Sequence, residues 1–179
     1  MARMLRRLEG LAMAALTMVL VSPALAQGPS LADKQYVSTA IETNNAEIAT
    51  AHLALRKSNS NDIKAFAQRM IHDHTQLNLQ MTPLAEKLDV AVGPGQVTAH
   101  QSQIAAQLKD LRGSAFDQQY LAAMVKGHQK AVQETQTEAD QSQFPPVKMA
   151  AQKALPVIQT HLQLAENLAK THQVQVGKP

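Results

Sequence analysis

Four long stretches of this chain carry apolar residues at alternating steps of three and four, and this spacing constrains the fold more than any other feature. Such steps return to one face of an α-helix, whereas a half-buried strand would alternate at every second residue. The first two stretches run over about 31–57 and 62–88, the third begins near Gly113, and the fourth follows the proline pair at 145–146. The pattern therefore predicts an all-α fold built from four long helices.

The breaks between these stretches predict the topology. Ser58 to Asn61 makes a short turn, and 141–146 makes another, because paired prolines cannot lie inside a helix. The segment 89–112 is longer and contains Gly93-Pro94-Gly95 followed by a short amphipathic helix near 99–111. Two hairpins joined by a long connection are typical of a ferritin-like antiparallel four-helix bundle. Capping boxes are expected at Ser30 with Asp33 and at Ser114 with Asp117.

The N-terminus has the order of a secretory signal peptide. Three arginines precede an apolar run from Leu11 to Val21, and Ala24-Leu25-Ala26 supplies the small residues that signal peptidase reads. The alternative, a membrane anchor, needs about 20 apolar residues, which is more than this run offers. We expect cleavage after Ala26 and a periplasmic or secreted mature chain. The remaining residues, 27–179, should form one bundle with a core over about 31–172.

Charge and cysteine content exclude several classes of protein. Without residues 1–26 the chain has 14 basic and 13 acidic residues, so it offers no electrostatic case for nucleic acid. It has no cysteine, which excludes disulfides, thiolate metal sites and a lipid-anchored lipoprotein. No segment after the signal is apolar enough to be expected to cross a membrane.

Three of the four apolar stripes contain a histidine, namely His74, His128 and His161. The first stripe carries Asn44 instead, with Glu47 beside it. At ~1.5 Å rise per residue, the three histidines and Glu47 fall within roughly one helical turn of a common height. Imidazoles and a carboxylate that converge from several helices can bind a transition metal. The alternative is a set of separate core histidines, each hydrogen-bonded to a local polar group.

Four further residues could support such a site. Met70 lies four residues before His74, and Met124 lies four residues before His128. A thioether beside an imidazole favours copper as the metal. The alternative is that these methionines only fill the core. Asp73 could orient a metal ligand, or lie solvated on the helix surface. Tyr120 could donate a hydrogen bond near the site, or simply pack in the core.

Three motifs resemble a known bacterial family. They are Phe66-Ala67-Gln68-Arg69-Met70-Ile71-His72-Asp73-His74-Thr75, the segment from Gly113 to Leu121 running to His128, and Leu155-Pro156 followed by His161-Leu162. Together they resemble the family catalogued as domain of unknown function 4142, over about 33–169. The resemblance implies a secreted, ferritin-like protein of the cell envelope, of a kind often provisionally labelled as outer-membrane proteins. It implies no established activity.

The sequence departs from diiron ferritins, which use Glu-x-x-His pairs on two helices. The residues three positions before the seam histidines are Ile71, Val125 and Ile158. Iron oxidation is therefore not expected, and no nucleophile arrangement or phosphate-binding loop favours another enzyme.

We expect a periplasmic bundle that binds copper, iron or zinc through His74, His128, His161 and Glu47, for metal binding, buffering or stress protection. The alternative is a non-catalytic cell-envelope protein without a metal, which binds a partner or stabilises the cell surface and whose histidines are core hydrogen-bonding residues. A second copy of the chain or another envelope protein could be a partner in either case.

Overall fold

The computed structural model describes residues 28–93 and 95–176 and contains five helices in this part of the chain. They are α1 (Leu31–Lys57), α2 (Asn61–Lys87), α3 (Ala99–Leu108), α4 (Gly113–Gln141) and α5 (Pro145–Thr171). The predicted all-α fold, with four long helices and a short extra helix in the long connection, is confirmed. The expected signal peptide lies outside the described residues.

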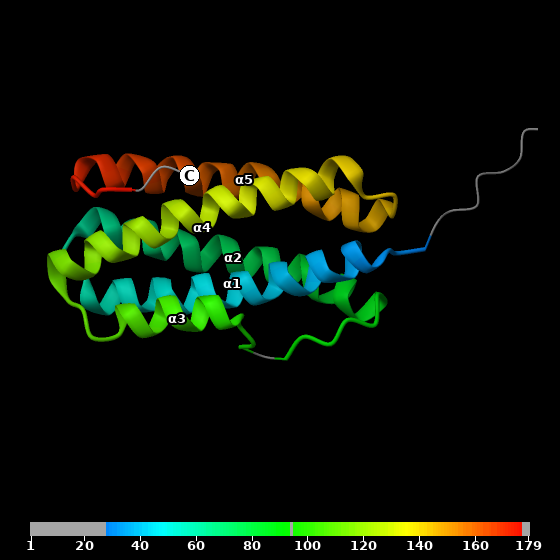
Figure 1. Cartoon of the computed structure of the whole chain (residues 1–179), viewed down its shortest axis with the longest axis horizontal. Coiled ribbons are helices and arrows are strands. Elements are labelled where there is room, and N and C mark those ends of the chain that lie inside the picture. Colours follow the sequence, from blue (N-terminus) through cyan, green and yellow to red (C-terminus); the bar gives the residue numbers. More distant parts are fainter. Residues whose placement is uncertain (1–27, 94, 177–179) are drawn as a thin grey trace, which may run out of the picture.

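The four long helices form two antiparallel hairpins that pack against each other. Figure 1 shows α1 beside α2 and α4 beside α5, with the connection after α2 running back along the bundle before α4 begins. Helix α3 lies in that connection and contacts α1 and α4. Because α1 also contacts α4, and α2 contacts α5, all four long helices can turn one face to a shared interior.

The first predicted capping box is confirmed, and the second is wrong. The Ser30 hydroxyl accepts from the backbone N–H of Asp33, and the Asp33 carboxylate accepts from the backbone N–H of Ser30. Asp33 also accepts a hydrogen bond from Ser142, which joins the start of α1 to the end of α4. Helix α4 instead begins at Gly113, whose φ of 55° suits glycine, after an N-cap at Arg112 that makes no side-chain cap bond.

The interior is divided into apolar layers with a histidine layer between them. One large cluster includes Phe66, Phe116 and Tyr120, whose rings make a stacked pair at 5.6 Å and an edge-on pair at 6.3 Å. The opposite end is aliphatic and includes Val37 and Met81. Along each of the helices α2, α4 and α5, residues of the large cluster lie on one side of the buried histidine, and residues nearer the aliphatic end lie on the other. Apolar burial therefore fixes the height at which the polar layer lies.

Over 28–93 and 95–176, no helix combines the length and the hydropathy that a bilayer-spanning segment needs.

Candidate metal centre

Three histidine rings from three helices meet in the middle of the bundle. The ring centroids of His74 on α2, His128 on α4 and His161 on α5 lie 5.1 to 5.9 Å apart. One nitrogen from each ring lies within 4.8 Å of the other two. All three side chains are buried. Bulk water therefore does not hydrate these nitrogens, and the protein must satisfy them in another way.

His128 is held by its own helix. Its Nδ1 lies 2.8 Å from the backbone carbonyl oxygen of Met124, one turn earlier. A carbonyl oxygen only accepts, so Nδ1 carries the proton and donates it. The Nε2 atom of the same neutral ring is then left with a lone pair, which is the form of imidazole that binds a metal.

His74 is held by a chain of amides between α1 and α2. Its Nδ1 lies 2.8 Å from Oδ1 of Asn44, whose amide nitrogen donates to Asn78 at 2.9 Å. Asn78 in turn donates to Asn45 at 2.9 Å. Because Asn44 uses its amide nitrogen on Asn78, its oxygen faces the imidazole, and Nδ1 of His74 must be the donor. Its Nε2 therefore also keeps a lone pair.

His161 is held by a carboxylate from another helix. Its Nε2 donates to Oδ2 of Asp73 at 2.9 Å, and Arg69 donates to the same oxygen at 3.2 Å. This places the lone pair of His161 on Nδ1. Asp73 is adjacent in sequence to His74 but orients His161, the ligand candidate on α5.

Each of the three rings keeps one buried nitrogen with a lone pair and no hydrogen-bond partner in the described part of the chain. His74 Nε2, His128 Nε2 and His161 Nδ1 are buried and have no hydrogen-bond partner among the residues that the structure describes. Each unsatisfied buried acceptor costs about 1–3 kcal/mol. Each opposite ring nitrogen bonds to an oxygen acceptor, which is the arrangement that outer partners give to metal-ligating histidines. The cluster can therefore hold a metal ion.

The surroundings keep these rings uncharged at neutral pH. Burial lowers the pKa of His128 to about 4, helped by the nearby His161. Burial and the two neighbouring imidazoles lower the pKa of His74 well below its ordinary value. For His161 burial also lowers the pKa, and the bond to Asp73 opposes this without overcoming it. Neutral imidazole is the state that a metal needs, so no proton has to be displaced first.

Glu47 lies near this layer but outside the three-nitrogen group. Its side chain is buried, and Oε2 has no hydrogen-bond partner in 28–93 and 95–176. Burial raises the pKa of this carboxyl to about 8. A Cβ atom at Gly127, the residue before His128, would lie 3.5 Å from Oε1, so the carboxyl packs against α4 where glycine leaves room. Glu47 is not a member of the group formed by the histidines.

The other accessory candidates lie in the large apolar cluster. Met70, Met124 and Tyr120 are buried there, and Met124 contacts the site through its backbone carbonyl. The hydroxyl of Tyr120 has no hydrogen-bond partner among the described residues. Burial and the charge of Glu47 raise the pKa of this hydroxyl well above its ordinary value.

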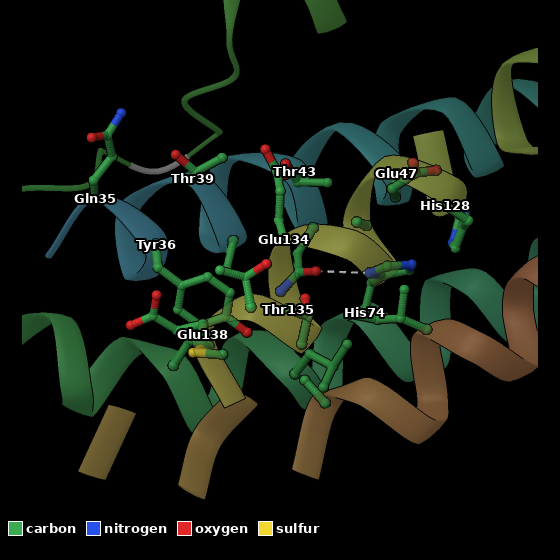
Figure 2. A pocket seen from close by; sticks show the side chains of 18 of the residues that line it. Gln35, Tyr36, Thr39, Thr43, Glu47, His74, His128, Glu134, Thr135 and Glu138 are labelled. Carbon is green, nitrogen blue, oxygen red and sulfur yellow. Dashed lines mark hydrogen bonds between the residues drawn. The ribbon is translucent and has the colours of Figure 1, made fainter. Parts of the chain in front are cut away.

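A cavity of about 320 Å³ adjoins the histidine layer. His74, His128 and Glu47 lie toward one end of it, and Tyr36 and Glu138 lie toward the other (Figure 2). The dashed line at His74 in Figure 2 is its hydrogen bond to Asn44.

Asn44 was predicted to lie on the apolar stripe of the first helix, but no role was predicted for it. Asn78 was not predicted to take part in the site. The available signal was the position of Asn44 at the height of His74, since a buried amide needs partners. The pairing of Asp73 with His161 has no sequence signal, because it depends on how α2 and α5 pack.

Comparison with known proteins agrees with the resemblance described above. A family model described as domain of unknown function DUF4142 matches residues 20–168. Two solved structures are similar in fold. A DUF305 fragment from Deinococcus radiodurans has a TM-score of 0.69 and 17% identity, covering 80% of this chain and 99% of its own. A DUF305 protein from Streptomyces coelicolor, provisionally named as secreted, has a TM-score of 0.69 and 13% identity, covering 83% and 96%. No curated protein matches the chain.

Proposed function

This chain belongs to the family described as domain of unknown function DUF4142, and we propose that it is a periplasmic protein that binds one transition-metal ion. The ligands are His74 Nε2, His128 Nε2 and His161 Nδ1. The observation that carries the proposal is the convergence of three buried lone pairs whose opposite ring nitrogens are all held by oxygen acceptors.

A metal ion satisfies this arrangement better than water does. A water molecule can donate two hydrogen bonds, so one of the three acceptors would stay without a partner. A cation accepts electron density from all three nitrogens at once. In a tetrahedral zinc site the ligand nitrogens lie roughly 3.3 Å apart. The nitrogens here lie within 4.8 Å of one another, so small side-chain rotations would bring them to an ion.

The ligand set favours particular metals. Neutral imidazole nitrogens suit copper, zinc, iron and nickel, and they suit magnesium or calcium poorly. For a given set of nitrogen ligands copper(II) binds more tightly than zinc, and zinc more tightly than iron(II). We therefore propose copper or zinc, with iron third, and a role in binding and buffering the ion in the cell envelope.

Glu47 is proposed as a neighbour that balances the charge of the ion. Three neutral imidazoles leave the two positive charges of a divalent ion uncompensated in a buried layer. Besides Asp73, which bonds to His161, the buried carboxyl of Glu47 is a candidate for compensation, because it packs against the residue before His128. A cation close to Glu47 would lower the pKa of that carboxyl and favour its charged form.

Elemental analysis of the untagged protein purified from its own periplasm tests the proposal. The expected result is close to one metal ion per chain, with copper or zinc in excess of iron. A protein that contains no metal and takes up no copper, zinc, iron or manganese by calorimetry would contradict the proposal. The histidines would then be core residues of a structural or partner-binding bundle.

Asp73→Asn is expected to lower metal affinity about 10–100-fold, because outer partners orient ligand imidazoles and raise their basicity. The side chain keeps its size but loses the charge that holds His161. Competition with a chromophoric chelator measures the affinity. The control is Asp62→Asn, which removes a carboxylate at the start of α2 that contacts the partly exposed His172 just after the end of α5. Equal affinity in Asp73→Asn and the wild type would show that Asp73 has no part in the site.

A further inference from the structure

The cavity beside the histidine layer is built from all four long helices. His74 and His128 line it, whereas His161 does not. His161 instead bonds to Asp73, a partly exposed residue that does not line the cavity. The cavity therefore opens onto the histidine group on the side of His74 and His128.

Metal sites with three protein ligands keep a further coordination position for an exchangeable molecule. That position needs free space next to the ligands, and the cavity provides it. We propose that the cavity binds a small uncharged molecule with an apolar body, which coordinates the metal through one nitrogen or oxygen atom. This inference rests on the proposed function, because it requires the ion.

The lining of the cavity determines this class of ligand. Beyond the histidines, polar and apolar residues both line the cavity, and most of the exposed surface of its wall is apolar. Seven lining residues are apolar, and four of them are alanines that leave room: Ala32, Ala40, Leu77, Met81, Ala131, Ala154 and Ile158. A volume of about 320 Å³ is at the lower end of small-molecule sites. An aliphatic wall favours an apolar body, since burying a charge there costs more than burying a neutral group.

The carboxyl groups that line the cavity offer an anion no attraction. Glu134 and Glu138 line it along with Glu47, and Glu134 forms an ion pair with Lys130 on the helix surface. Tyr36 and Thr135 line the same part of the cavity. No lysine or arginine is among its lining residues in the part of the chain described. An anion would thus gain attraction from the metal alone, and it would lose its hydration on entering.

Titration of the cobalt(II)-loaded full mature protein with pyridine tests the inference, with visible absorption as the readout. Pyridine is a neutral nitrogen donor with an apolar ring, and azide is the anionic probe. The wild type is expected to show a saturable spectral change with pyridine and weaker binding of azide. Ala131→Leu is expected to keep cobalt and lose pyridine affinity about tenfold or more, because the added side chain occupies the cavity.

Two variants keep the test independent of any one substitution. Ala40→Leu fills the cavity from α1 and should have the same effect as Ala131→Leu. Ala122→Leu, at a partly buried position of α4 outside the lining, should leave pyridine binding unchanged. The inference is overturned if bound cobalt does not respond to pyridine, if both cavity-filling variants bind pyridine like the wild type, or if azide binds as tightly. Metal uptake by the wild type is a separate readout, and a protein that takes up neither cobalt nor copper nor zinc would reject the proposed function itself.

Discussion

Replacing both His74 and His128 with alanine is expected to abolish metal-dependent stabilisation of the protein. The variant loses two of the three histidines that could hold the ion. Its affinity for the metal should therefore fall by more than the roughly 100-fold that is lost when a residue that only orients a ligand is removed. At a metal concentration about 1,000 times the Kd, the wild type should gain roughly 4 kcal/mol of unfolding free energy. For a domain of this size that corresponds to roughly 8–16 °C in Tm.

Thermal unfolding with and without copper or zinc measures this effect. The matched control is the double variant His52→Ala/His72→Ala, which removes two exposed histidines from α1 and α2 and keeps the buried three. This control should respond to metal as the wild type does. A metal-dependent rise in Tm that survives in His74→Ala/His128→Ala would place the binding site elsewhere and reject the proposed ligands. Circular dichroism of the metal-free variants checks that each is folded.

Glu47→Gln is expected to stabilise the metal-free protein strongly at alkaline pH. Burial raises the pKa of this carboxyl from about 4.5 in an unfolded chain to about 8. Between these two values the folded state binds more protons than the unfolded state. The stability that this group provides is therefore complete below about pH 4.5 and is lost as pH rises through 8. At 1.36 kcal/mol per pKa unit the loss is on the order of 5 kcal/mol. Glutamine keeps the shape of the side chain and does not ionise.

Urea unfolding of the metal-free wild type and of Glu47→Gln at pH 5 and pH 9 measures the difference. The advantage of the variant should grow by several kcal/mol between these pH values. Glu42→Gln, on the same helix at a partly exposed position, shows what removal of a carboxylate does away from the interior. If the difference in unfolding free energy between the wild type and Glu47→Gln stays constant with pH, burial does not raise the pKa of Glu47.

The histidines add an opposite pH trend in the metal-free protein. The folded pKa of His128, about 4, lies below the unfolded value of about 6.5. The unfolded state therefore binds more protons within that range, and the stability from this group is present above pH 6.5 and lost as pH falls toward 4. The pH ranges of the two contributions overlap between about pH 4.5 and 6.5, so the comparison with Glu47→Gln is needed to separate them.

The helices could be predicted because their signals are local. The three-and-four spacing and the turn at 58–61 each depend on residues close in sequence, and the predicted and observed bounds of α1 are the same. The start of α4 near Gly113 was predicted, but its cap was not. Ser114 and Asp117 have the right spacing for a capping box, but Gly113 adopts a positive φ and the N-cap is Arg112, two residues before Ser114. Steric freedom at glycine decided that helix start.

The histidine layer could be predicted in outline because helical rise converts sequence position into height. Three seam histidines at one height in a bundle with this topology must lie near one another. The same calculation placed Glu47 at that height, and the structure puts it outside the three-nitrogen group. The height of a residue along the helix axis does not tell in which direction around the axis its side chain points. That direction depends on how side chains from neighbouring helices interdigitate.

The sequence by itself therefore determined the fold class, the order of the helices and the presence of histidines in a shared polar layer, because these follow from local periodicity and from helical rise. Only the tertiary structure decided which ring nitrogen of each histidine is free, that Asp73 holds His161, and that a cavity adjoins the layer. Hydrogen bonds and cavities between helices depend on side-chain positions to within about an ångström, and packing across the bundle sets those positions.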